Sequence, residues 1–173
     1  MATERFKLTK KLAFTAVLSA LAVVILYLGA ILDILDLSAA AIASLCVLFL
    51  LCELGTRFAL AGYAVISLLS LLLLPTKTGA IVFTAFLGYY PVAKYWFEKK
   101  LPRPLSWVCK FALLNASVCL MLLLVRYVMV DPLWLEITTL VGCNLAFLLL
   151  DILMDRLLVL YVRLWRKKLH IRF

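Results

Sequence analysis

Long apolar runs separated by short polar breaks dominate the chain. A helix that crosses a bilayer needs about 17–25 apolar residues. Six runs of this length or longer occur, at residues 12–32, 37–54, 57–74, 79–97, 107–130 and 134–162. Backbone groups in hydrocarbon must be hydrogen-bonded within their own segment, so each run is predicted to be a helix. The pattern therefore predicts an all-α integral membrane protein with six transmembrane helices.

The breaks between the runs are too short to hold a separate folded domain. They read "DILDLS", "ELGTR", "PTKTG", "EKKLPRP" and "VDPLWLE". We therefore expect residues 1–173 to form a single six-helix membrane domain, with the first apolar run retained as a helix and not cleaved as a signal peptide. The composition agrees, because 67% of the residues are hydrophobic, against about 45–50% in an ordinary soluble domain.

Basic residues lie at the edges of the runs and on one predicted side of the bundle. The chain holds 18 Lys and Arg against 9 Asp and Glu. The cations gather in the N-terminal arm, between the fourth and fifth runs, and at the C-terminal end. An even number of crossings places these three regions on one side, which the positive-inside rule makes cytoplasmic. We thus expect both termini to be cytoplasmic and the bilayer, not a nucleic acid, to be the partner of this charge pattern.

The sequence lacks the motifs of the common enzyme classes. Residues 77–79 read Lys-Thr-Gly, as in penicillin-binding enzymes, but the Ser-x-x-Lys nucleophile that must accompany this element is missing. His170 is the one histidine in the chain, and no Gly-rich phosphate loop occurs. We therefore expect no enzymatic activity, no metal site and no cofactor.

Polar residues in the predicted outer loops are the first candidates for ligand binding. A cation is disfavoured on the outer side, so Lys77 needs a reason beyond a turn. Pro75 and Gly79 are explained by the turn itself. The candidate ligand contacts are Asp33, Asp36, Thr76, Lys77 and Thr78.

Polar residues inside the apolar runs form a second group of candidates, because burying them in a membrane is costly. Arg126 lies near the outer end of the fifth run and either snorkels outward or faces a pocket. Asn115 and Asn144 lie deeper. They either join helices by hydrogen bonding or line a ligand cavity.

Asp151 and Asp155 share one face of the last helix. They either pair with Lys94 or Arg57 at the inner interface or form a contact that responds to a partner subunit. In the fourth run, Pro91 within "FLGYYPVAKYW" removes a backbone donor and predicts a kink. Broken helices in membranes often border cavities, so a cavity there is the alternative to a simple kink.

The N-terminal stretch "KLTKKLAFTAVLSALAVVILYLG" resembles the first helix of the substrate-binding S components of energy-coupling factor (ECF) transporters. "LDLS" and "LLLLPTKTG…FLGYYP" are similar to segments of Firmicute-type members. The six short-looped helices also fit that family. In this resemblance, the small-residue face formed by Ala16 and Ala20 is the contact for the transmembrane T subunit.

The resemblance implies a mechanism and a location. A vitamin or related micronutrient is captured at the outer side of a bacterial plasma membrane, by outer helix halves and the loops. The T subunit and two ATPase subunits then reorient the chain to release the ligand inward. Two alternatives remain open: a structural or assembly protein similar to MreD-type cell-shape proteins, and a small self-sufficient carrier.

Overall fold

The computed structural model describes residues 2–32, 35–128, 133–161 and 163, and almost all of them are helical. The elements are α1 (Ala2–Leu32), α2 (Asp36–Leu54), α3 (Thr56–Leu73), α4 (Thr78–Val82), the π-helix η1 (Phe83–Leu87), α5 (Tyr90–Lys100), α6 (Arg103–Val128) and α7 (Leu133–Leu160). No strand occurs in these described ranges. The predicted all-α class is therefore confirmed.

Three helices are long and apolar enough to cross a membrane: Leu8–Leu32 within α1, all of α2 and all of α3. Their bounds lie within a few residues of the runs at 12–32, 37–54 and 57–74. In α6 the described apolar segment, Pro104–Leu120, is shorter. Three apolar helices thus support a membrane-embedded protein. The total of six crossings and the cytoplasmic location of both termini stay predictions.

The chain divides into two compact units, residues 1–99 and residues 100–172. Unit 1 holds α1 to α3, α4, η1 and nearly all of α5, and unit 2 holds α6 and α7. This division is not predicted by the pattern of runs and breaks, because the break between the units is as short and polar as the other breaks. That the two units act as one domain stays a prediction.

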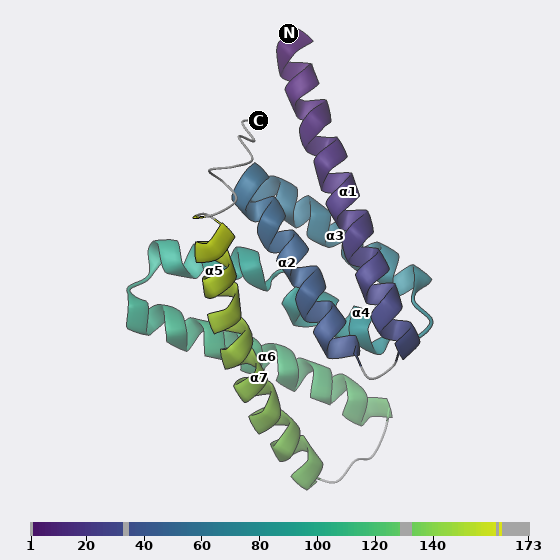
Figure 1. Cartoon of the computed structure of the whole chain (residues 1–173). Coiled ribbons are helices and arrows are strands. Elements are labelled where there is room, and N and C mark those ends of the chain that lie inside the picture. The colour runs from purple at the N-terminus through teal and green to yellow at the C-terminus, as the bar shows by residue number, and fades with distance from the viewer. Residues whose placement is uncertain (1, 33–34, 129–132, 162, 164–173) are drawn as a thin grey trace. The chain divides into compact units, whose positions relative to one another are not determined.

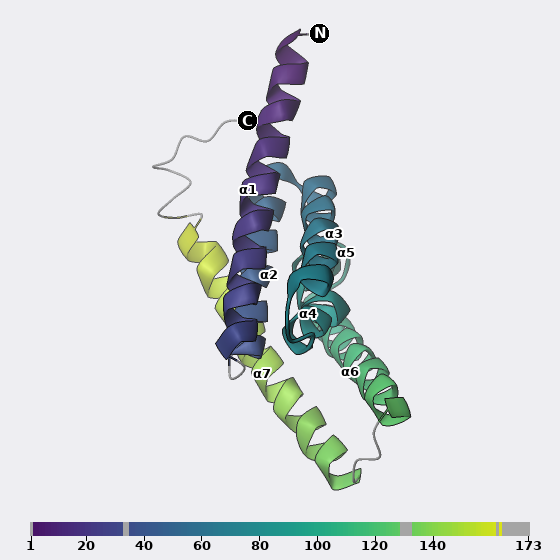
Figure 2. The same cartoon turned by 90° about the vertical axis from the view of Figure 1, so that its right-hand side faces the viewer.

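In unit 1, α1, α2 and α3 pack against one another, and α4 and η1 contact α2. Figures 1 and 2 show α4 beside the end of α1 and the start of α2, while the N-terminal part of α1 projects beyond the other helices of this unit. The charge pattern predicts that the projecting end is cytoplasmic and that the α4 end is external.

Small residues let the helices of unit 1 approach closely. A Cβ added at Gly29 of α1 would lie 2.4 Å from the Cβ of Ala39 on α2. A Cβ added at Gly62 of α3 would lie 2.5 Å from Cδ1 of Leu50 and 3.4 Å from Oγ of Ser19. At Gly29 this distance leaves no room for a side chain, because the Ala39 Cβ is attached to the backbone, whereas at Gly62 the Leu50 side chain would have to move. Backbone proximity of this kind is how membrane helices gain packing where no hydrophobic effect drives them together.

The fourth apolar run is broken, as Pro91 predicts. Gly88 N–H donates to the carbonyl of Phe83 at 2.7 Å, a five-residue step that closes the π-helix η1. The Tyr63 hydroxyl of α3 donates to the carbonyl of Thr84 at 2.9 Å. Gly88 is required here, because a Cβ would lie 2.5 Å from the Tyr63 ring. The break therefore packs against α3, and a neighbouring side chain bonds one of its carbonyls.

Candidate functional site

One end of unit 1 gathers polar residues from two connections. Asp36 begins α2. Thr76 and Lys77 lie in the connection from α3 to α4, and Thr78 and Gly79 begin α4 (Figure 1). We call Asp36, Thr76, Lys77, Thr78 and Gly79 the Asp36 end. The sequence predicted four of these residues as ligand contacts, and the structure brings them to the same end of one unit.

Asp36 packs directly against the first turn of α4. A Cβ added at Gly79 would lie 3.1 Å from Oδ1 of Asp36 and 3.5 Å from its backbone oxygen. Any larger residue at position 79 would displace either the carboxylate or α4. Gly79 thus favours the close approach of α4 to Asp36, in addition to the turn that the sequence predicted.

The Oδ1 atom of Asp36 is buried and has no hydrogen-bond partner among the described residues. Leaving a buried acceptor unsatisfied costs about 1–3 kcal/mol, and more if it is charged. Asp36 lies in the first turn of α2, where the helix dipole returns about 0.3–1 kcal/mol to an acidic side chain. The smaller term does not offset the larger one. A hydrogen-bond donor supplied from outside the chain would stabilise this carboxylate.

The side chains of Thr76 and Lys77 bond to backbone carbonyls and not to Asp36. Thr76 Oγ1 donates to the carbonyl of Ala30 in the last turn of α1 at 3.2 Å. Lys77 Nζ donates to the carbonyls of Leu71 and Leu74 at 2.8 and 2.7 Å. Helix ends leave carbonyls unpaired and attract cations, so Lys77 has a structural reason to lie where it does. Its predicted role as a ligand contact stays a prediction.

The predicted partner face on α1 is free within unit 1. Ala16 and Ala20 are both exposed. The adjacent positions Thr15 and Ser19, by contrast, are 6% and 2% exposed and point towards the other helices of the unit. The two alanines therefore lie on the side of α1 that faces lipid or another protein.

Asn115 of α6 and Asn144 of α7 bond to each other within unit 2. The amide of Asn115 donates to Oδ1 of Asn144 at 3.2 Å, and the amide of Asn144 donates to Oδ1 of Asn115 at 3.0 Å. Asn115 also donates to the carbonyl of Phe111 at 2.9 Å. This geometry supports the helix-joining interpretation of the two residues. They belong to a different unit from the Asp36 end.

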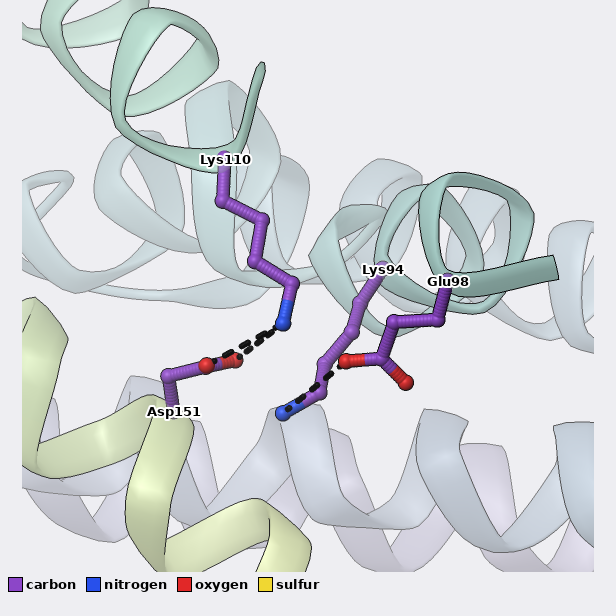
Figure 3. A network of polar contacts seen from close by, with 4 residues as sticks. All are labelled: Lys94, Glu98, Lys110 and Asp151. Atoms are coloured by element: carbon purple, nitrogen blue, oxygen red, sulfur yellow. Dashed lines mark hydrogen bonds and ion pairs between the residues drawn. The ribbon is translucent and has the colours of Figure 1, made fainter. Parts of the chain in front are cut away.

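Unit 2 also holds an ion pair that the sequence did not predict. Lys110 Nζ of α6 lies 3.2 and 3.5 Å from the two carboxylate oxygens of Asp151 on α7 (Figure 3). The two side chains are 3% and 0% exposed. The ammonium also lies 5.2 Å from the centroid of the Trp107 ring, close enough for a cation–π interaction.

In the sequence, Lys110 counts only as one of the basic residues that indicate which side of the membrane is cytoplasmic. Lys94 or Arg57 was the predicted partner of Asp151. The signal for Lys110 was its place in "WVCKFALL", well inside α6 and away from its end. Lys94 and Glu98 form a separate pair one turn apart in α5, 4.0 Å apart (Figure 3). Glu98 is 45% exposed, so that contact contributes little.

Two predicted site residues receive no structural account. Asp33 lies outside the described residues, and Arg126 lies in α6 with its side chain outside the described part. Among the described residues, no three His, Cys, Asp or Glu side chains gather as a metal site requires. Comparison with protein-family models, with curated proteins and with solved structures finds no match.

Proposed function

We propose that this chain is the substrate-capture subunit of an ECF-type importer. In this proposal it binds a vitamin or related micronutrient at the extracellular side of the bacterial plasma membrane. Partner subunits then drive uptake with ATP. The observation that carries the proposal is the Asp36 end, where polar residues from two connections lie together and a buried carboxylate oxygen has no partner among the described residues.

In this proposal the chain binds the ligand, and other subunits hydrolyse ATP. The chain has no phosphate-binding loop, so the energy for transport comes from other subunits. Ligand sites in membrane proteins gather polar groups where the backbone is irregular. The Asp36 end meets this description, because two connections between helices lie there.

The exposed face of Ala16 and Ala20 is the proposed contact for the T subunit. Small residues allow two helices in a membrane to approach closely, and a larger side chain keeps them apart. Because both positions are exposed in unit 1, enlarging them leaves the packing of α1 against α2 and α3 unchanged.

The test is co-purification of the full chain from its native membrane in mild detergent, with mass spectrometry of the attached proteins. The wild type is expected to bring an ATPase with it. The double variant A16L/A20L is expected to reduce ATPase recovery at least about tenfold, as loss of a close helix contact implies. The matched control A61L/A64L enlarges two exposed alanines of α3 and is expected to retain the ATPase. Absence of any ATPase from the wild-type sample would contradict the proposal.

A structural or assembly role is the second candidate, and the bonding of Thr76 and Lys77 favours it. Both side chains donate hydrogen bonds to backbone carbonyls, as expected of a loop whose role is only to connect and position helices. This candidate predicts that the purified protein retains no small molecule. It also predicts co-purifying proteins without ATPase subunits.

A further inference from the structure

The Asp36 end presents an acceptor without a matching donor. Oδ1 of Asp36 is buried and lacks a hydrogen-bond partner within the described part of the chain. The carboxylate is wedged against Gly79, where even a methyl group would lie 3.1 Å from Oδ1. Asp36 as a whole is partly exposed, so a ligand can reach it, and a positive charge placed beside Oδ1 would stabilise the carboxylate.

The nearby cation and hydroxyl do not supply that charge or that hydrogen bond. Lys77 Nζ is held by two carbonyls at the end of α3, at 2.8 and 2.7 Å. Thr76 donates to Ala30 on α1. Lys77 is the one basic residue between Arg57 and Lys94 in the sequence, so the loop has no second lysine or arginine to turn towards Asp36.

We propose that the ligand of the Asp36 end carries an ammonium group, which the carboxylate of Asp36 binds. This inference rests on the proposed capture function and adds the charge of the substrate to it. The sequence alone names both Lys77 and Asp36 as ligand contacts, and the predicted outer side carries four acidic residues against two basic ones, which mildly favours a cationic or zwitterionic ligand. The structure commits the ammonium of Lys77 to carbonyls at the end of α3, and Oδ1 of Asp36 has no hydrogen-bond partner among the described residues. Both observations point to a positively charged group on the ligand.

An organic cation fits this end better than a metal ion. Calcium takes six to eight oxygen ligands, and magnesium takes six in a strict octahedron. No group of three potential metal ligands is found among the described residues. An ammonium group, by contrast, is satisfied by one carboxylate together with a few neutral oxygens.

The test uses the purified full-length chain and a defined probe. The probe is an equimolar mixture of B vitamins, amino acids and polyamines, which contains cations, zwitterions, anions and neutral molecules of similar size. Bound compounds are identified by mass spectrometry after gel filtration. The wild type is expected to retain compounds that carry an ammonium group. D36N, which keeps the shape of the side chain, is expected to bind them at least about tenfold more weakly, as loss of a charge-assisted hydrogen bond implies.

Two controls separate this effect from misfolding. E98Q makes the same carboxylate-to-amide change at an exposed position of α5 and is expected to bind as the wild type does. On the wild type alone, each retained amine is compared with its N-acetyl derivative, which has lost the charge. The derivative is expected to bind at least about tenfold more weakly, and this measurement needs no variant that folds.

The remaining outcomes overturn one proposal or the other. Retention of only anionic or neutral compounds would overturn the cationic ligand and leave the capture function standing. The cationic ligand would also be overturned if an amine and its N-acetyl derivative bound equally well. Equal binding of the amines by the wild type and by D36N would have the same consequence. If the wild type retained no compound at all, the capture function itself would be contradicted.

Discussion

The two units of this protein hold their helices together by different means. In unit 1, α1, α2 and α3 meet where glycine and alanine allow close backbone approach, as at Gly29 with Ala39. In unit 2, α6 and α7 are joined by pairs of polar side chains, Lys110 with Asp151 and Asn115 with Asn144. At Gly142, the glycine of unit 2, no atom of the described residues lies within 4 Å of an added Cβ.

The difference shows which substitutions each unit tolerates. Unit 1 is sensitive to added volume, because its contacts leave no space. Unit 2 is sensitive to lost partners, because a polar group that loses its partner stays buried. Three experiments test this contrast, in order of decreasing expected effect.

The largest effect is expected from removing one member of the buried ion pair. D151A leaves the Lys110 ammonium buried without this carboxylate, and breaking such a pair costs about 3–5 kcal/mol. The measurement is the free energy of unfolding in a titration of mixed micelles with SDS, followed by circular dichroism.

The matched control removes both charges of the same pair. K110M/D151L replaces them with apolar side chains, and an apolar replacement of a buried pair is often neutral or stabilising. The double variant is therefore expected to be more stable than D151A. If it is less stable, the pair contributes through geometry and not through balanced charge.

A smaller effect is expected from added volume in unit 1. In G29A the new methyl would lie 2.4 Å from Ala39 Cβ, which is attached to the backbone and cannot rotate away. Overpacking of this kind costs about 1–3 kcal/mol. The same SDS titration measures the loss.

Two variants sharpen this result. G142A adds the same methyl in unit 2, where the described part of the chain has no atom within 4 Å of it. It is expected to be neutral or to gain up to about 1 kcal/mol from helix propensity. G29A/A39G moves the methyl from α2 to α1 and is expected to recover stability relative to G29A. Equal losses in G29A and G142A would remove the basis for the contrast between the units.

The smallest effect is expected from the asparagine pair. A double-mutant cycle of N115A and N144A is expected to give a coupling energy of about 0.6 kcal/mol, and at most about 1.7 kcal/mol, the range of polar contacts between membrane helices. The comparison cycle pairs N115A with L160A at the far end of α7 and is expected to be additive. A coupling of zero between the asparagines would show that their hydrogen bonds are replaced by others when one is removed.

The sequence correctly predicted the features that depend on local pattern. The apolar runs at 12–32, 37–54 and 57–74 correspond to α1, α2 and α3, since length and apolarity are properties of a single segment. Pro91 correctly predicted the break in the fourth run, because a missing N–H acts on its own helix.

The sequence also named several of the polar residues that contact other parts of the chain, but it did not show what each one contacts. It named Asn115 and Asn144, but it left open whether they join two helices by hydrogen bonding or line a ligand cavity. It counted Lys110 only among the basic residues that indicate the orientation of the helices, whereas Lys110 is buried against Asp151. A contact between two helices depends on their register and rotation, which no single segment encodes.

By itself, then, the sequence determined the all-helical class and the apolar segments that correspond to α1, α2 and α3, and it named polar loop residues as candidates for ligand binding. The tertiary structure decided which polar groups are already engaged. In the structure, Lys77 Nζ donates to the carbonyls of Leu71 and Leu74. Oδ1 of Asp36 is buried beside Gly79. The physical reason is distance: a hydrogen bond needs atoms within about 3 Å, and only the packing of helices brings distant parts of the chain that close.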